Sequence, residues 1–341
     1  MTLWPRTPQF NDDDYPYVNP SKDRKVALIT GGNSGIGFFT VLHLYLHGYV
    51  VYIAGRSKSR VLKSIKELKE QADRIRSKYS GSLINERFLG ELYFLEIDLL
   101  NLNSVLVGAE NFANLEKRLD ILINNAGVMA LPFSMTQDGF EIQLQTNYIA
   151  PFVLTTKLLP ILERTAELST NKVPPRILYL SSIGHKFAFR YFNMNSTFNY
   201  KPNIIFTWFR YGLAKTAGIH FMKMLALRNP KILSMAVHPG FVMNTNLFSY
   251  WTSLPIIGIM FWCLFQIFGF FFGVSNEIGS YASVKCCLDQ NLSIEKSNGK
   301  YFATNGVEAE PSSVAKNMDY AARTWIWTIH QLSERNINIP N

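Results

Sequence analysis

The feature that most constrains this chain is a short apolar run followed at once by a glycine-rich turn and then by apolar residues at helical spacing. Residues 25–30 (KVALIT) have the composition of a β-strand, and residues 36–46 have the spacing of a helix. Thr30–Gly37 (TGGNSGIG) joins them. Strand, tight turn and helix in this order form the start of a βαβ unit, in which the turn can hold an anion at the positive end of the helix.

The rest of the chain repeats this alternation. Further strands are predicted at 49–54, 92–97, 119–123, 176–180, 232–237 and 300–303, with helical patterns between them. Strands that alternate with helices predict right-handed crossovers and a parallel sheet covered on both faces. The predicted fold is therefore α/β, a doubly wound parallel sheet of the Rossmann type. We expect a single domain over residues 25–335, after an N-terminal extension of residues 1–24.

Glycines in the turn allow a pyrophosphate to approach the backbone closely. An ordinary strand-to-helix turn is the alternative, but the spacing Gly-x-x-x-Gly-x-Gly is more specific than that. Other motifs follow it in the chain. They are Asn-Asn-Ala-Gly at 124–127, Ser-Ser at 181–182, Tyr-x-x-x-Lys at 211–215 and His-Pro-Gly-Phe-Val at 238–242.

This set of motifs resembles the short-chain dehydrogenase/reductase family, and residues 25–335 look like its retinol-dehydrogenase-like branch. The N-terminal stretch 6–17 and an apolar segment in mid-chain are also similar to a lipid-droplet oxidoreductase of fungi. The family resemblance implies that the turn binds a nicotinamide dinucleotide. The residues expected to do so are Gly31, Asn33, Ser34, Gly35, Ile36 and Gly37.

The Tyr-x-x-x-Lys spacing places a phenol and an ammonium on one helix face. A neighbouring Lys and an oxidised nicotinamide would favour the phenolate of a tyrosine whose free pKa is near 10. The resemblance implies that Tyr211 is the general acid in reduction, or the base in oxidation. It also implies that Ser182 hydrogen-bonds the substrate oxygen, that Lys215 holds the nicotinamide ribose, and that Asn147 orders a proton-relay water.

Arg56 follows the second predicted strand, where an NAD enzyme usually places an acid. A guanidinium there favours the 2′-phosphate of NADP, although a surface arginine at a helix start is the alternative. The expected cofactor is NADP (NADPH). The family pattern does not decide whether Asn244 or Thr245 contacts the pyrophosphate. By resemblance, the other cofactor contacts are Asp98, Asn125, Gly127, Tyr211, Lys215, Pro239, Gly240 and Val242.

Residues 254–274 carry no charge and could cross a hydrocarbon layer of about 30 Å as a helix. Pro255 and three glycines also suit a hairpin or an interfacial helix, and a buried core helix is a further alternative. We expect an embedded segment that associates with a membrane or a lipid monolayer. The expected location is the lipid droplet, and also the endoplasmic reticulum membrane, on the cytosolic side.

The net charge of +9 is partly concentrated in residues 56–78. Such a run indicates either a solvated helix face or attraction to anionic lipid headgroups. Because no recognition motif accompanies the charge, nucleic acid is not an expected partner. The three cysteines lack the spacing of metal ligands, and no metal is expected. The family resemblance leaves a homodimer open.

These observations predict an NADP(H)-dependent oxidoreductase that interconverts a lipophilic alcohol and its aldehyde or ketone at a lipid surface. The aromatic insert 186–209 is expected to form a pocket wall or to cover the active-site mouth. One alternative is a non-catalytic lipid-droplet scaffold that keeps the fold. Another, a sugar-nucleotide epimerase or dehydratase, predicts a Gly-x-x-Gly-x-x-Gly spacing that the turn does not have.

Overall fold

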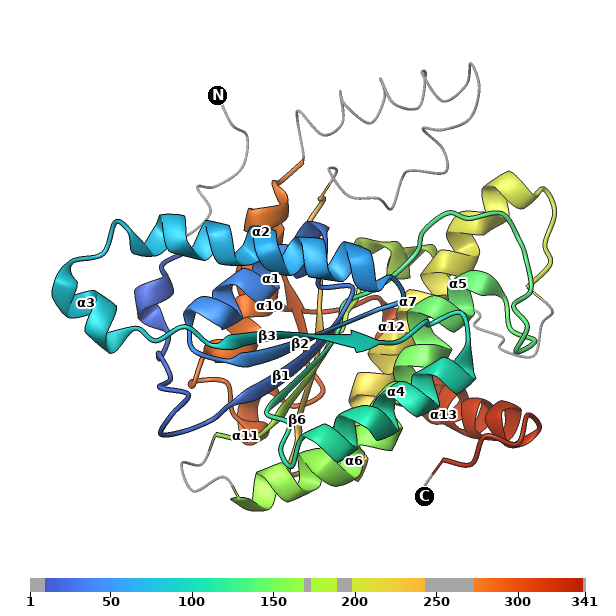
Figure 1. Cartoon of the computed structure of the whole chain (residues 1–341). Helices are drawn as coiled ribbons and strands as arrows, with labels where there is room; N and C mark the ends of the chain where they lie inside the picture. Colours follow the sequence, from blue (N-terminus) through green and yellow to red (C-terminus); the bar gives the residue numbers. More distant parts are fainter. Residues whose placement is uncertain (1–9, 169–172, 189–197, 243–272, 340–341) are drawn as a thin grey trace.

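The computed structural model describes residues 10–168, 173–188, 198–242 and 273–339 (Figure 1). Its strands form one sheet in the order β3-β2-β1-β4-β5-β6-β7-β8. The strands are β1 (Val26–Thr30), β2 (Val50–Gly55), β3 (Glu91–Glu96), β4 (Ile121–Asn124), β5 (Arg176–Leu180), β6 (Leu233–Val237), β7 (Tyr301–Ala303) and β8 (Val307–Ala309).

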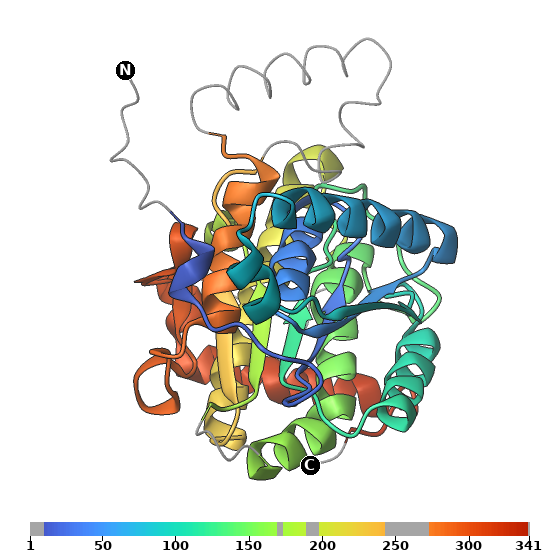
Figure 2. The ribbon, with the colours of Figure 1, turned by 60° about the vertical axis from the view of Figure 1, so that its left-hand side comes forward.

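Two helical layers cover the sheet (Figures 1 and 2). One layer contains α1 (Gly35–Leu46), α2 (Lys58–Arg76) and α10 (Asn276–Leu288). The other contains α4 (Leu102–Leu115), α6 (Ala150–Leu168), α7 (Asn203–Arg228) and α13 (Met318–Ser333). Short helices complete the described part: α3 (Gly81–Glu86), α5 (Ile142–Leu144), α11 (Ile294–Ser297) and α12 (Ser313–Lys316).

Burial on both faces explains why the predicted strands read as continuous apolar runs. In β1, Val26 and Leu28 point into the core beneath α4 and α6, whereas Ala27 and Ile29 point into the core beneath α1 and α10. All four side chains are inaccessible to solvent. The predicted doubly wound sheet is therefore confirmed.

The last strand of the sheet, β8, was not among the predicted strands. β8 pairs with β7 in the antiparallel direction, after a turn in which Asn305 and Gly306 have positive φ angles of 62° and 66°. β8 has three residues, and Val307 and Glu308 in it are exposed. A strand this short and this exposed has no apolar periodicity to detect.

The described part of the predicted N-terminal extension, residues 10–24, packs on the helical layer of α1 and α10. Asp12 accepts a hydrogen bond of 2.7 Å from Nδ1 of His43 on α1. Phe10 stacks on Tyr281 of α10, with 4.1 Å between ring centroids. This extension is thus attached to the sheet domain by partly buried polar and aromatic contacts.

The end of α13 holds the loop that follows β4. Nε of Arg335 donates to the carbonyl oxygen of Asp138 at 2.8 Å, and its guanidinium lies 4.1 Å from the ring centroid of Phe140. The carboxylate of Asp138 in turn accepts from Nε2 of Gln145 at 2.6 Å. The loop is thereby fixed from both sides.

Among the described residues, no helix is both long enough and apolar enough to cross a membrane. Most of the predicted lipid-associating segment, residues 254–272, lies outside the described residues. The two stretches of chain on either side of residues 243–272 lie next to each other. Val242 pairs with Val274, and the nitrogen of Val274 donates to the carbonyl oxygen of Phe241 at 2.9 Å.

Candidate active site

The predicted site residues lie at the carboxyl ends of the strands, near β1. From β1 the strand order runs to β2 and β3 on one side and to β4, β5 and β6 on the other. This is the position at which open α/β sheets bind their ligands. A Cβ added at Gly37 would collide with the carbonyl oxygen of Gly31, so the turn into α1 requires glycine there. Ser34 is the N-cap of α1, and its hydroxyl makes no capping hydrogen bond in the described structure. The turn therefore presents the helix N-terminus to an anion.

Asn125 holds this turn in place. Its amide nitrogen donates to the carbonyl oxygens of Thr30 at 2.8 Å and Gly31 at 3.1 Å. The neighbouring Asn124 is fully buried and donates to Oγ1 of Thr155 at 2.9 Å, as expected of a structural residue. Asn125 thus shapes the predicted dinucleotide site by fixing its backbone.

A pocket of about 670 Å³ extends from the turn along the edges of β2, β3 and β4. Six of the predicted cofactor residues line it: Gly31, Asn33, Ser34, Arg56, Asp98 and Gly127. The pocket volume, the glycine turn and the helix N-terminus together fit a dinucleotide. The residues present are therefore compatible with the predicted cofactor.

The end of the pocket beneath α2 is basic. Arg56, Arg60 and Lys63 all line it, and neither guanidinium forms an ion pair with a described carboxylate. Lys63 lies 3.8 Å from Glu67, and its side chain is 80% exposed. Sequence reasoning singled out Arg56 alone. The signal that it missed is the helical spacing, because Arg60 and Lys63 project from the first turns of the helix that follows Arg56.

The predicted catalytic serine, tyrosine and lysine converge beside this pocket. Tyr211 and Ser182 both lie against Gly184, where an added Cβ would stand 2.5 Å from Cε1 of Tyr211 and 3.4 Å from Oγ of Ser182. Nζ of Lys215 lies 5.8 Å from the ring centroid of Tyr211 and donates to the carbonyl oxygen of Leu180 at 2.7 Å. The predicted helical placement of Tyr211 and Lys215 on α7 is therefore confirmed by the geometry.

Asn147 lies in a π-helical turn, Gln145–Ile149, between α5 and α6. Its side chain is fixed because its oxygen accepts from the nitrogen of Val128 and its amide donates to the carbonyl of Val128, both at 2.8 Å. A Cβ added at Gly127 would lie 2.8 Å from Oδ1 of Asn147 and 3.4 Å from Nζ of Lys215. Gly127 therefore lies between the pocket and the four predicted catalytic residues, which we call the predicted tetrad: Asn147, Ser182, Tyr211 and Lys215.

Burial alters the acid-base properties of these groups. It raises the pKa of Tyr211 to about 12, although the neighbouring Ser182 side chain acts in the opposite direction. Burial also lowers the pKa of Lys215 to about 7. In the protein alone, Tyr211 is thus a neutral phenol, and the expected phenolate requires more than the neighbouring lysine.

The remaining predicted cofactor residues do not line the pocket. Gly35 and Ile36 belong to the first turn of α1 and are not among the residues that line the pocket. Pro239, Gly240 and Val242 follow β6, and Val242 packs near Gly279 of α10. The two candidate pyrophosphate contacts, Asn244 and Thr245, lie outside the described residues.

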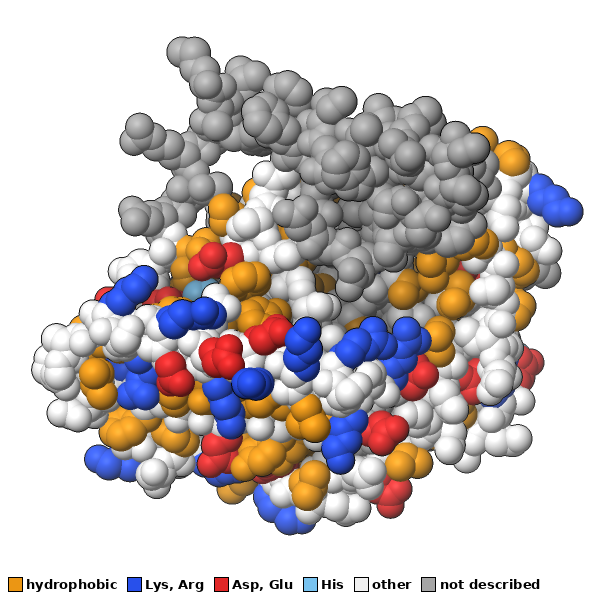
Figure 3. Space-filling view, turned by 45° about the horizontal axis from the view of Figure 1, so that its top comes forward, with side chains coloured by type: hydrophobic (Ala, Val, Ile, Leu, Met, Phe, Trp, Pro, Cys, Tyr) orange, Lys and Arg blue, Asp and Glu red, His pale blue; other side chains and the backbone are white. Residues whose placement is uncertain are grey.

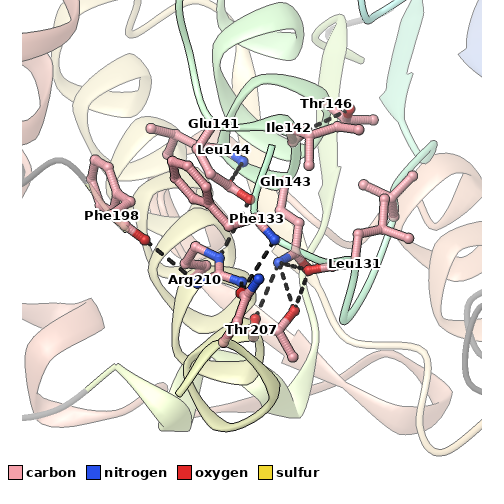
Figure 4. Close-up of polar contacts among 12 residues, drawn as sticks. Leu131, Phe133, Glu141, Ile142, Gln143, Leu144, Thr146, Phe198, Thr207 and Arg210 are labelled. Atoms are coloured by element: carbon pink, nitrogen blue, oxygen red, sulfur yellow. Dashed lines mark hydrogen bonds and ion pairs between the residues drawn. The ribbon is translucent and has the colours of Figure 1, made fainter. Parts of the chain in front are cut away.

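Sequence reasoning also missed a buried polar network that joins the loop after β4 to α7 (Figure 4). Arg210 and Glu141 are both buried, with Nε of Arg210 3.5 Å from Oε1 of Glu141. Arg210 also donates to Oδ1 of Asn203 at 2.5 Å. Nearby, Nε2 of Gln143 donates to the carbonyl oxygen of Thr207 at 3.1 Å. Because Arg210 precedes Tyr211, this network fixes the part of α7 that carries the predicted catalytic tyrosine.

A pocket at a glycine-rich turn with Ser, Tyr and Lys beside it, on a doubly wound sheet, is the arrangement found in oxidoreductases that use a nicotinamide cofactor. A sequence profile described as short chain dehydrogenase matches residues 25–184. The chain belongs to the short-chain dehydrogenase/reductase family. It is 32% identical over 332 residues to the short-chain dehydrogenase/reductase drtF of Aspergillus calidoustus, covering 94% of this chain and 98% of that protein.

Retinol dehydrogenase 12 of the mouse is 34% identical over 304 residues, covering 88% of this chain and 84% of that protein. Relatives of this kind place the chain in the retinol-dehydrogenase-like branch. The RhlG/NADP complex of Pseudomonas aeruginosa has the same fold, with a TM-score of 0.58 at 19% identity over 83% of this chain and 95% of that chain.

Proposed function

We propose that this protein is an NADPH-dependent reductase of a lipophilic aldehyde or ketone, which also catalyses the reverse oxidation, and that it works at a lipid surface. The observation that carries the proposal is the convergence of the Tyr211 and Ser182 side chains around Gly184, with Lys215 beside the end of the pocket at Gly127. This arrangement brings a proton donor and a second hydroxyl to one point. A carbonyl oxygen placed there can accept from both groups.

When bound, the cofactor supplies a hydride to the carbonyl carbon. Tyr211 donates its phenolic proton to the carbonyl oxygen, and it suits this role because it is neutral at physiological pH. Ser182 orients that oxygen through its hydroxyl. Lys215 stabilises the phenolate that remains on Tyr211, because a charged ammonium nearby favours the deprotonated form. Asn147 holds the loop at Val128, and so keeps the pocket wall next to Lys215.

The basic end of the pocket supports the preference for NADPH. Arg56 and Arg60 present two guanidinium groups without described acidic partners, and Lys63 adds an ammonium. A guanidinium can bind a phosphate through two parallel hydrogen bonds. These residues would hold the 2′-phosphate that distinguishes NADP from NAD.

Apolar side chains near the site support a lipophilic substrate. Phe187, which follows β5, is 46% exposed, and Phe241, which follows β6, is 41% exposed. A lipid surface is supported by the uncharged run 254–274 and by its flanking ends at Val242 and Val274, which pair beside Phe241. In α2 the basic side chains outnumber the acidic ones, and Figure 3 shows the two kinds interspersed on one face of the molecule. Such a face can attract anionic headgroups.

The test is NADPH oxidation by detergent-purified protein with retinal, long-chain aldehydes and ketosteroids as substrates, beside Tyr211→Phe. We expect turnover with at least one of these compounds and a loss of at least about 100-fold in Tyr211→Phe, because the proton donor is removed. Binding of NADPH by the variant, followed by fluorescence, verifies that the site is folded. Binding without turnover by the wild-type protein would instead support the non-catalytic scaffold.

The lipid surface is tested separately by deletion of residues 254–274, followed by flotation with phospholipid-coated triolein droplets. We expect the full chain to float and the deletion variant to remain in the soluble fraction. Flotation of the variant to the same extent would contradict the assigned role of the segment. Its NADPH affinity, unchanged within about twofold, would show that the deletion leaves the cofactor site intact.

A further inference from the structure

A tyrosine that no motif singles out lies directly behind the predicted tetrad. Tyr179 is on β5, three residues before Ser182, and is 1% exposed. Its hydroxyl donates to the carbonyl oxygen of Asn147 at 2.8 Å and lies 3.4 Å from the carbonyl oxygen of Ala214 on α7. Tyr179 thus stands between the π-helical turn and the helix that carries Tyr211 and Lys215.

The sequence that follows Asn147 removes one backbone donor that its carbonyl could otherwise use. In an α-helix that carbonyl would accept from the main-chain nitrogen of the residue four positions later. That residue is Pro151, which has no hydrogen on its nitrogen. A buried carbonyl without a donor is costly, and the hydroxyl of Tyr179 replaces the missing N–H group.

The other side of Tyr179 faces the catalytic helix. A Cβ added at Gly218 would overlap the ring of Tyr179, so α7 accepts this ring by having glycine in its interior. Nζ of Lys215 lies 5.2 Å from the ring centroid of Tyr179, within the range of a cation–π contact. One side chain therefore contacts the backbone of one predicted tetrad residue and the ammonium of another.

We infer that Tyr179 is a positioning residue for the reduction, which fixes the backbone of Asn147 with its hydroxyl and supports Lys215 with its ring. The inference rests on the proposed reductase activity. If the hydroxyl is removed, the carbonyl of Asn147 loses its donor and its dipole is no longer compensated. The pKa of the nearby Lys215 should then rise, because an uncompensated carbonyl favours the charged ammonium. Tyr211 in turn loses the arrangement in which its phenolate is stabilised.

The test compares Tyr179→Phe with Tyr148→Phe. Tyr148 is a matched control because it is also 1% exposed and also hydrogen-bonded, through its hydroxyl, to Oγ1 of Thr328 at 2.7 Å. Its partner is on α13. Each substitution removes one buried hydroxyl and keeps the ring, so the two should lower the thermal unfolding temperature by similar amounts.

In the Tyr179→Phe variant we expect kcat to fall about tenfold, whereas the substrate KM and the NADPH Kd stay within about twofold. The pH at which kcat is half-maximal should also move by about half a unit or more. Tyr148→Phe should change none of these quantities by more than about twofold. Equal kcat values and equal pH profiles in the two variants would overturn the inference and leave Tyr179 with a structural role only.

A second measurement does not depend on turnover. Pulse acetylation at a series of pH values, read by mass spectrometry of the peptide that contains Lys215, reports the titration of that lysine. Tyr179→Phe should raise the midpoint, and Tyr148→Phe should leave it in place. If the wild-type protein reduces no carbonyl compound, the proposed function fails, but this measurement still decides the positioning role. An unchanged midpoint in Tyr179→Phe would overturn that role.

Discussion

The main-chain nitrogen of Ser312 donates a hydrogen bond of 3.0 Å to Nε2 of His185. The other ring nitrogen, Nδ1, lies 2.6 Å from the carbonyl oxygen of Ser182. Because Nε2 accepts, Nδ1 must carry the hydrogen, so the imidazole is held as one neutral tautomer. Burial also lowers the pKa of His185, although its bond to Ser182 acts in the opposite direction. The segment before α12 thus fixes the backbone of the predicted catalytic serine.

Replacing His185 should therefore affect both stability and catalysis. His185→Ala leaves the nitrogen of Ser312 without its acceptor, and leaves the carbonyl of Ser182 with only the 3.1 Å bond from the main-chain nitrogen of residue 185. This should cost about 1–3 kcal/mol in the free energy of unfolding. We expect kcat/KM to fall by about tenfold as Ser182 loses its fixed position. Urea unfolding and steady-state kinetics check both effects. His330→Ala, whose ring is 68% exposed, is the control and should match the wild type.

Cofactor preference should depend on Arg56 and Arg60 together. The double variant Arg56→Ala/Arg60→Ala should weaken NADPH binding by about 100-fold or more, because each lost charge-assisted hydrogen bond is worth about 1.5–3 kcal/mol. The NADH affinity should change by less than about threefold. Titration of both cofactors by fluorescence gives these values. Lys66→Ala, on the same helix but outside the pocket lining, should leave both affinities unchanged.

Stability should rise with pH because of Lys215. Its pKa in the folded protein, about 7, is far below the ordinary lysine value of 10.5, and burial is the cause. Between these pH values the unfolded chain binds a proton that the folded protein releases, so the free energy of unfolding increases with pH. Below pH 7 the folded protein carries the full cost of a buried ammonium.

Lys215→Met removes that cost along with the activity. We expect the variant without cofactor to be more stable than the wild type by about 2 kcal/mol at pH 6, with the gain shrinking towards pH 10. Urea unfolding at pH 6 and pH 9.5 measures the difference. A constant difference at both pH values would mean that the titration of Lys215 does not contribute.

The buried pair of Glu141 and Arg210 should be more sensitive to loss of one partner than to loss of both. Arg210→Met leaves a buried carboxylate without its cation, and we expect a cost of about 3–5 kcal/mol in the free energy of unfolding. Glu141→Gln/Arg210→Met should recover at least half of it. Urea unfolding of the two single variants and the double variant, as a cycle, checks this expectation. Additive losses would show that the two side chains do not interact.

The strands were predictable because the sheet is buried on both faces, which makes each strand an uninterrupted apolar run. β5 begins and ends at the predicted residues, and most other strands differ by one or two positions. The motif residues were predictable for a related reason. Parallel strands bring all their carboxyl ends to one edge, so residues such as Arg56 and Ser182 must lie along it.

What could not be predicted depends on contacts between distant parts of the chain. His185 gains its role from Ser312, and Tyr179 gains its role from Pro151, whose missing N–H group matters only once β5 lies beside the π-helical turn. Arg210 resembles any other helical arginine until Glu141 is placed against it. Each of these roles arises from an unsatisfied backbone group or charge, which no local pattern records.

The clamp by Arg335 has a consequence for synthesis of the protein on the ribosome. The loop that it holds, at Asp138, precedes it by 197 residues. Strands β1 to β4 emerge early and can pair with one another, yet the wall of the pocket beside them stays unclamped until α13 has left the exit tunnel. At about 5–20 residues per second, this delay lasts roughly 10–40 seconds. In a nascent chain, the glycine-rich turn would therefore be assembled well before the wall of the pocket takes its final position.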